Sequence, residues 1–204
     1  EEDMVMYTWM SLSPDSNYIV YAKNHNLYMR GNKYKGQDTT EIQLTTNGER
    51  YFSYARNGQD TVSDEEAMAG RWFPKVNKVY VLRQDNRNSD EMAVINVLAK
   101  PKPVLERYKY DMAGDKNLSK WVLSVIDVDK RKVTDFNIER WQDQDAEVRY
   151  VTDKGDKIFF ERYNRVRDEV ELCVGNTETG EVKVLIHEVD KPYIDYHMRN
   201  IVFL

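Results

Sequence analysis

Few side chains in this sequence have the types and spacing needed for binding or catalysis. The clearest group is an acidic run at Asp64, Glu65 and Glu66, directly after Ser63. Neighbouring carboxylates can accept charge-assisted hydrogen bonds from a cation. The same residues also fit the start of a helix, in which Ser63 caps the first turn and Glu66 completes a capping box. The residues by themselves favour the capping interpretation and predict a short helix over 63–69.

The other candidates carry weaker signals. Asn164 and Arg165 lie in a charged stretch between two apolar segments, which is typical of a surface hairpin. His25, His187 and His197 form no cluster with metal-ligand spacing, so no metal site or other cofactor is expected. No Gly-x-Ser-x-Gly motif occurs, and we assign no catalytic residue to the sequence.

Composition excludes several classes of function. The 204 residues carry a net charge of −5, which argues against nucleic acid and anionic membrane surfaces as partners. No apolar run approaches the roughly 18 residues needed to span a bilayer. A single cysteine, Cys173, excludes an intrachain disulfide, and its apolar neighbours predict a buried structural thiol. The 12% aromatic content favours sheet.

The elements that must position these residues are predicted from a recurring phrase, a polar turn followed by an apolar strand. The phrase occurs at residues 13–22, 74–82, 153–160 and 198–204. Lys157 and Asn200 are 43 residues apart, and Lys78 and Lys157 are 79 apart, close to two units of about 40. Asn17 and Lys78 are 61 apart, so that unit is expected to carry an insertion. The predicted helix over 63–69 would fill it.

Strand patterns support the same architecture. Four short apolar segments with hairpin turns between them form one expected blade, at 148–152, 158–161, 170–174 and 182–186. Further hairpins are expected from 18–22 with 27–29, from 79–82 with 92–98, and from 121–128 with 132–138. The predicted fold is all-β: a partial β-propeller of about four to five blades of four-stranded antiparallel sheet, with one short helical insertion, spanning residues 1–204 as a single segment.

The ends of the sequence suggest a piece of a longer protein. It begins Glu1-Glu2-Asp3 without an initiator methionine and ends at Phe203-Leu204 inside an apolar run. Blades of a propeller stack mainly on their neighbours, so an open arc would expose blade faces and strand edges. We therefore expect self-association, with a homo-oligomer as one form of it.

Several short motifs occur in the order found in the propellers of prolyl-oligopeptidase-type serine peptidases. Ser13-Pro14-Asp15 is followed by Asn26-Leu27-Tyr28-Met29, and Trp72-Phe73-Pro74 follows the acidic run. Further matches lie at 44–48, 110–117, 141–145, 160–165, 171–172, 179–180 and 187–188. Each motif is weak alone, but the ordered set resembles the N-terminal propeller of the dipeptidyl peptidase IV family from about residue 9 to the end.

The resemblance implies a two-part enzyme. In that family the propeller covers an α/β-hydrolase domain that carries a Ser-Asp-His triad, expected here beyond Leu204. The chain alone would then be inactive. Its implied partners are peptide substrates with a free N-terminus and the hydrolase domain of the same chain, and the implied location is the periplasm or cell envelope of a bacterium.

The resemblance also implies a role for the acidic run. In the family, a pair of glutamates on a short propeller helix binds the α-amino group of the substrate, so that dipeptides are released. Glu65 and Glu66 match this pair, although they lie closer to Trp72 than the family pattern suggests, and Asp64 with Glu65 is an alternative pair. Helix capping remains the competing interpretation.

Asn164 and Arg165 match in position a polar pair near the carbonyl end of the substrate, with a plain surface hairpin as the alternative. A different class of function also remains open, in which the chain is a non-enzymatic β-propeller for protein–protein interaction in the cell envelope. The acidic insertion favours the peptidase, because an interaction propeller does not need it.

Overall fold

A computed structural model describes residues 7–58, 64–195 and 201–203, and antiparallel strands dominate it. The strands are β1 (Ser11–Leu12), β2 (Tyr18–Lys23), β3 (Asn26–Gly31), β4 (Ile42–Gln43), β5 (Arg71–Trp72), β6 (Lys78–Asp85), β7 (Glu91–Asn96), β8 (Val104–Lys109), β9 (Lys120–Asp127), β10 (Lys132–Phe136), β11 (Asp145–Val151), β12 (Lys157–Tyr163), β13 (Glu169–Asn176) and β14 (Val182–Val189). A short 3-10 helix, η1, spans Lys33–Lys35.

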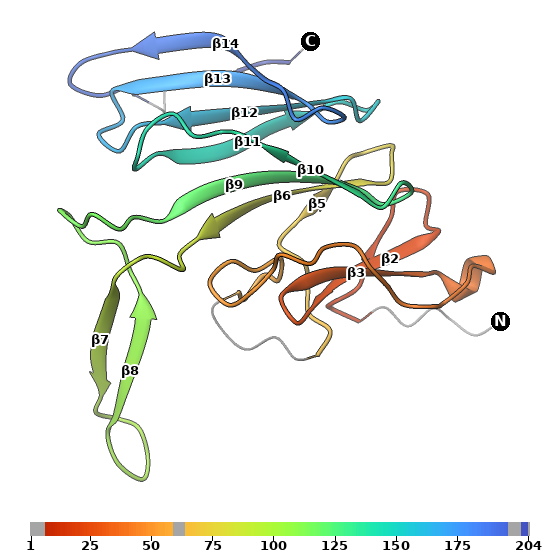
Figure 1. The fold of residues 1–204 in the computed structure, drawn as a ribbon, viewed down its shortest axis with the longest axis horizontal. Coiled ribbons are helices and arrows are strands. Elements are labelled where there is room, and N and C mark those ends of the chain that lie inside the picture. Colours follow the sequence, from red (N-terminus) through yellow and green to blue (C-terminus); the bar gives the residue numbers. More distant parts are fainter. Residues whose placement is uncertain (1–6, 59–63, 196–200, 204) are drawn as a thin grey trace.

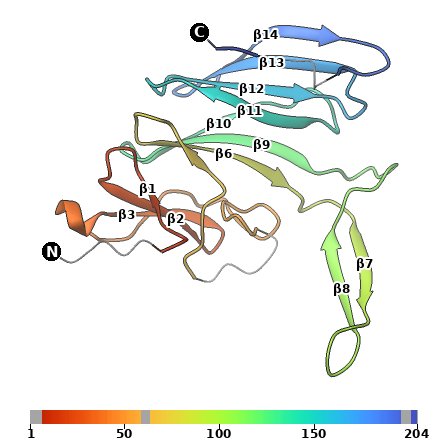
Figure 2. The ribbon, with the colours of Figure 1, turned by 180° about the vertical axis from the view of Figure 1, so that it is seen from behind.

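The strands form three four-stranded sheets and one two-stranded ribbon. The sheets have the orders β1-β2-β3-β4, β10-β9-β6-β5 and β11-β12-β13-β14, and β7 pairs with β8. Figures 1 and 2 show the sheet of β5, β6, β9 and β10 lying between the other two, like successive blades. The β7–β8 ribbon projects away from the stack. The predicted all-β partial propeller is therefore confirmed.

The middle sheet buries both of its faces, and the alternation along β6 shows how. Val79 and Val81 belong to the core shared with β2 and β3. Tyr80 and Leu82, which point to the opposite face, pack against the core shared with β12. Successive side chains of a strand point to opposite faces, so a strand that is apolar at nearly every position fits between two neighbouring sheets.

The recurring turn phrase forms the turn that its residues predict. The Ser13 hydroxyl donates to Asp15 Oδ1 at 2.7 Å, and the Asn17 backbone N–H donates to the same oxygen at 2.9 Å. Asn77, in the next copy of the phrase, donates to Asp15 Oδ2 at 2.8 Å. Burial would raise the pKa of Asp15, but the hydrogen bonds from Asn77, Ser13 and Asn17 outweigh it and lower that pKa to about 2.

The blade count and one strand pairing differ from the sequence prediction. Three four-stranded sheets are present among the described residues, against the four to five expected. The expected hairpin of 79–82 with 92–98 is wrong, because β6 pairs along its whole length with β9. Residues 91–109 instead fold back on themselves as the β7–β8 ribbon, inserted between those two partners.

The helix predicted over 63–69 is also wrong. Ser63 lies outside the described residues, and the following residues are extended. Glu66 exchanges two backbone hydrogen bonds with Ala22 of β2, at 2.9 and 2.8 Å, and residues 67–69 bond on their other side to 54–56. A helix this short is marginal by itself. The extended form instead satisfies backbone groups against two flanking segments, and this outweighs the local capping signals.

The predicted blade at 148–186 is confirmed as β11–β14, and the hairpin of 121–128 with 132–138 as β9–β10. The last copy of the turn phrase, at 198–204, falls mostly outside the described residues. Phe203 is described and stacks on Tyr150 of β11, with ring centroids 4.9 Å apart. Among the residues that the structure describes, no helix is long and apolar enough to cross a membrane.

Cys173 should be inert as a thiol in the folded protein. It is fully buried in β13, and burial raises its pKa to about 11. The thiolate is the reactive form, so neither accessibility nor ionisation favours reaction at pH 8. We expect no labelling by Ellman's reagent under native conditions and one equivalent after unfolding in guanidinium. Rapid native labelling would contradict the packing around β13.

Candidate functional site

The acidic segment lies beside β2, where the backbone pairing at Ala22 fixes it. Asp64 is exposed, while Glu65 and Glu66 are half-buried. Glu66 is the residue that pairs with Ala22, and Met68, two positions on, is buried in the core between the first two sheets. The extended backbone is therefore anchored immediately after the carboxylates.

This backbone separates the two glutamates that the sequence grouped together. Adjacent residues of an extended segment point to opposite sides. In agreement, the charge of Glu65 acts on Tyr21 and Lys23, whereas that of Glu66 acts on His25. A clamp formed by Glu65 and Glu66 on one face of a helix is thus replaced by two separate carboxylates with different surroundings.

The side of the segment that holds Glu65 already contains an ion pair. The Glu41 carboxylate accepts a hydrogen bond from the Tyr21 hydroxyl and lies 3.1 Å from Lys23 Nζ. The Tyr21 hydrogen bond lowers the pKa of Glu41. The pKa of Tyr21 rises, mainly because of burial and then because of that hydrogen bond. The hydrogen bond to Glu41 raises the pKa of Lys23. A cation approaching Glu65 would therefore meet the ammonium of Lys23.

The side that holds Glu66 has different electrostatics. His25 lies in the tight turn after β2, and its Nδ1 is 3.0 Å from the Ser53 hydroxyl. Burial lowers the pKa of His25, and the charge of Glu66 only partly offsets this. The imidazole is therefore mainly neutral at pH 7. Within the described part of the chain, the side chains of Asp64, Glu65 and Glu66 make no hydrogen bond or ion pair with another residue.

Asn164 holds its own turn. Its amide donates to Asp168 Oδ1 at 2.7 Å, and its side-chain oxygen accepts the backbone N–H groups of Asp168 and Glu169 at 3.1 and 3.2 Å. These bonds satisfy both ends of the amide and close the β12–β13 hairpin. The geometry agrees with the surface-hairpin interpretation.

Arg165, the next residue, has different surroundings from Asn164. It lines a pocket of about 220 Å³ together with Asp111, Asp143 and Asp145. Burial raises the pKa of Asp111. Hydrogen bonds from Ser119 and Ser89 and, after them, the charge of Arg165 lower it by more, so that the pKa falls overall. The structure thus places the arginine in an acidic hollow.

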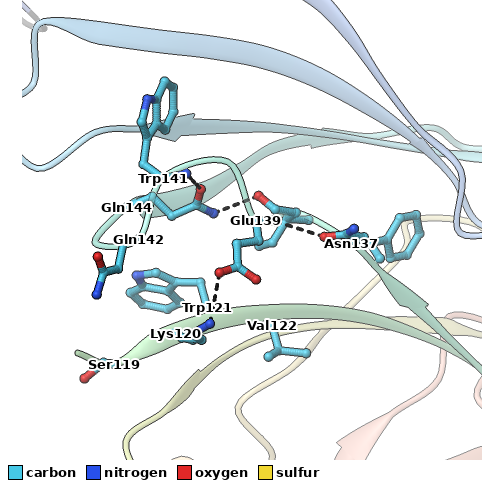
Figure 3. Close-up of a pocket in the computed structure, with 11 residues that line it drawn as sticks. Ser119, Lys120, Trp121, Val122, Asn137, Glu139, Trp141, Gln142 and Gln144 are labelled. Carbon is cyan, nitrogen blue, oxygen red and sulfur yellow. Dashed lines mark hydrogen bonds and ion pairs between the residues drawn. The ribbon is translucent and has the colours of Figure 1, made fainter. Parts of the chain in front are cut away.

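A second pocket, of about 160 Å³, lies beside the first and is shown in Figure 3. It sits between the start of β9 and the loop at 137–144, and Trp121 lines both pockets. Lys120 and Glu139 form an ion pair of 2.9 Å across it. The Gln144 amide accepts a hydrogen bond from the Arg140 backbone N–H and donates one to the Ile138 carbonyl. The polar groups largely satisfy one another, which leaves the Trp121 face as the main contact surface.

Comparison with protein families decides the affiliation. Residues 4–203 match the family model described as the dipeptidyl peptidase IV (DPP IV) N-terminal region. The chain belongs to this family. With this match, the resemblance seen in the ordered motifs is confirmed over nearly the whole sequence.

Curated relatives agree with the affiliation of this DPP IV N-terminal region. The chain is 29% identical over 177 residues to a probable dipeptidyl-aminopeptidase B of Colletotrichum graminicola, a match that covers 79% of the chain and 18% of the relative. It is 25% identical over 202 residues to a probable dipeptidyl-aminopeptidase B of Podospora anserina, covering 90% and 21%. The chain thus spans about a fifth of the length of the curated relatives it matches.

Solved structures support the fold. Dipeptidyl peptidase 4 of Porphyromonas gingivalis superposes with a TM-score of 0.68 at 19% identity, covering 91% of this chain and 26% of that one. A putative dipeptidyl aminopeptidase IV of Bacteroides ovatus superposes with a TM-score of 0.65 at 18% identity, covering 91% and 24%. At these identities the superpositions support the fold of the DPP IV N-terminal region and carry no conclusion about its function.

The sequence identified the acidic segment of this DPP IV family domain but missed the Trp121 pockets. Trp121 begins the expected strand at 121–128, and its ring packs against the core of the second and third sheets. Its other surface is open to the two hollows. No local signal distinguishes a packed tryptophan from one with a free face, because the loop at 137–144 that shapes the pocket is not recognisable from spacing.

Proposed function

We propose that this chain is the non-catalytic propeller segment of a serine dipeptidyl peptidase, where it restricts peptide access and anchors the free amino terminus of the substrate. The family match over residues 4–203 supports the peptidase context. The observation that carries the anchoring role is the half-buried carboxylate of Glu66, which has no hydrogen-bond partner in the described structure. Carboxylates in this condition favour a cationic ligand.

Between the two glutamates, the electrostatics favour Glu66. A substrate ammonium beside Glu65 would be repelled by Lys23, whereas the neighbour of Glu66 is a mainly neutral histidine. Asp64, two positions before Glu66, is the second acceptor in this proposal because alternate residues of an extended segment share a side. Glu65 then supports the local charge without contacting the substrate.

The test is steady-state kinetics of the protein that carries this domain and its hydrolase domain, identified by a Gly-x-Ser-x-Gly motif beyond residue 204. We expect Glu66→Gln to lower kcat/KM at least tenfold, about 1.4 kcal/mol, on an Xaa-Pro amide with a free N-terminus. On the N-acetylated amide, which lacks the ammonium group, kcat/KM of Glu66→Gln should equal that of the wild type.

Glu65→Gln is the matched control, since it removes the same charge one residue away. It should stay within about twofold of the wild type in kcat/KM. A loss confined to Glu65→Gln would assign the ammonium to the other side of the segment, and unchanged kinetics in both variants would reject the anchoring role.

A protein–protein interaction role is the second candidate, and the β7–β8 ribbon favours it. Ile95 and Leu98 are 65% and 85% exposed, and Leu105 on the facing strand is 54% exposed. An isolated two-stranded ribbon is marginally stable in water, so a partner surface would stabilise it. A parent protein without a hydrolase domain would favour this role, and so would peptidase kinetics that substitutions in the acidic segment leave unchanged. We further propose export to a bacterial cell envelope; the bacterial origin of the two solved structures with this fold supports the bacterial part of this proposal.

A further inference from the structure

Arg83, in β6, is the most deeply buried unpaired cation among the described residues. Its residue surface is 3% exposed. The guanidinium carbon lies 3.8 Å from the ring centroid of Phe52 and 3.5 Å from that of Tyr54, so the planar cation stacks on both rings. Stacking on aromatic faces stabilises arginine in a dry site, but it does not satisfy the N–H donors at the edge of the group.

Of the three guanidinium nitrogens, one has a weak hydrogen-bond partner and two have none. Nη1 donates weakly to the Phe52 carbonyl at 3.4 Å. Nε and Nη2 are buried and make no hydrogen bond, and no carboxylate forms an ion pair with Arg83. Burial lowers the pKa of Arg83, yet arginine stays charged in proteins. The charges of Asp135 and Asp85 act on Arg83 without forming an ion pair with it. A buried charge without direct hydrogen bonds is expensive, which makes its persistence in the fold informative.

The two free nitrogens share one edge of the guanidinium. Nε–H and the adjacent Nη2–H point in parallel, and this edge matches the two oxygens of a carboxylate. A carboxylate gives each donor its own acceptor oxygen, whereas a spherical anion must share one acceptor between the two donors. The unpaired atoms are therefore those that a bidentate carboxylate contact requires.

The neighbouring pocket has the matching charge. Arg83 lines a pocket of about 170 Å³ with Tyr51, Ser53, Gln84, Asn86 and the exposed Arg56. Among the described residues, its lining contains two arginines and no aspartate or glutamate, in a protein whose net charge is −5. Asn86 Oδ1 is a further buried atom without a partner. Turning the Asn86 amide over would present its N–H₂ group as another donor.

We infer that this pocket binds a carboxylate group of a ligand, with Arg83 as the bidentate contact and Arg56 as the cation at its mouth. Nε and Nη2 are themselves buried. Binding therefore turns the guanidinium within its stack on Phe52 and Tyr54, a rotation that keeps the aromatic contacts. This site is independent of the proposed amine anchor, because none of Asp64, Glu65 and Glu66 lines it.

Saturation-transfer NMR with acetate as the probe tests the site in the full-length protein at constant ionic strength. We expect a saturable acetate methyl signal in the wild type. The affinity for acetate should be at least tenfold lower in Arg83→Lys, which keeps the charge but lacks the bidentate edge. Arg56→Gln, a surface change, should weaken acetate binding by a smaller factor. Arg107→Gln, on the exposed ribbon, is the control and should bind acetate as the wild type does.

Two results would overturn the inference. Equal acetate affinity in wild type and Arg83→Lys, with native circular dichroism in both, would show that Arg83 is purely structural. Displacement of acetate by chloride at equal concentration would show a site without preference for the carboxylate shape. If Arg83→Lys does not fold, Arg56→Gln and the chloride competition still decide the question.

Discussion

Replacing Arg162 with leucine should lower the free energy of unfolding of this chain by about 3–5 kcal/mol. Arg162 and Glu171 face each other across β12 and β13, and both are buried. Glu171 Oε2 accepts from Arg162 Nε at 2.8 Å and from Nη2 at 2.6 Å. Arg162 Nη1 donates to the Ile138 carbonyl at 2.9 Å, which ties the third sheet to the loop after β10. Removing the arginine leaves a buried carboxylate whose one remaining charged partner among the described residues is Arg140, 3.4 Å away.

Denaturant unfolding measured by circular dichroism checks this value, with two comparisons. The double variant Arg162→Leu, Glu171→Leu should recover much of the loss, because apolar replacement of a whole buried pair is often nearly neutral. Arg167→Gln, which removes an exposed ion pair with Asp145 of 2.8 Å and the contact of the guanidinium with the Tyr163 ring, should cost about 1 kcal/mol. A double variant as unstable as the single one would show that packing, and not the unpaired charge, dominates.

The success of the sequence prediction follows the range of the interactions. The turn at Ser13 and Asp15 was predictable because the hydrogen bonds that close it from within join residues at most five apart. The blade of β11–β14 was predictable because consecutive strands pair through short turns. In both cases the residues that fix the structure are neighbours in the sequence, so composition and spacing carry the information.

The errors concern pairings between distant residues. The capping signals at Ser63 and Glu66 describe an isolated peptide correctly, but Ala22, more than 40 positions earlier, takes the backbone groups of Glu66. Likewise, β6 pairs with β9 across the whole ribbon and not with the next apolar segment. These outcomes depend on which edges the rest of the fold leaves open, and no local pattern reports that.

The candidate site shows the same division. The acidic composition of 64–66 is visible in the sequence, whereas the separation of Glu65 from Glu66 follows from a strand-like backbone. Arg83 had no signal at all, because one arginine in an apolar strand resembles a solvent-facing residue. Its meaning depends on Phe52 and Tyr54, about 30 positions away, which remove it from water.

Lys78 should be the second most sensitive position, because it joins the second and third sheets. Its ammonium is nearly buried and lies 2.7 Å from Glu178 Oε1, 3.0 Å from the Gly155 carbonyl and 3.1 Å from the Thr177 hydroxyl. Asp127 of β9 is 3.7 Å away. Lys78→Met keeps the length of the stem but removes all four contacts, and we expect a loss of about 3 kcal/mol in denaturant unfolding.

The pH dependence separates the charge of this cluster from its packing. Hydrogen bonds from Lys78 and Lys130 lower the pKa of Glu178 from 4.5 to about 2. A carboxylate whose pKa is lower in the folded state stabilises the fold above pH 4.5, and this contribution disappears as the pH falls towards 2. Stability should therefore decline less steeply through that window in Lys78→Met and in Glu178→Gln than in the wild type. Glu181→Gln, an exposed change in the same turn, should retain the wild-type slope, and parallel slopes in all four proteins would show that Lys78 acts through packing alone.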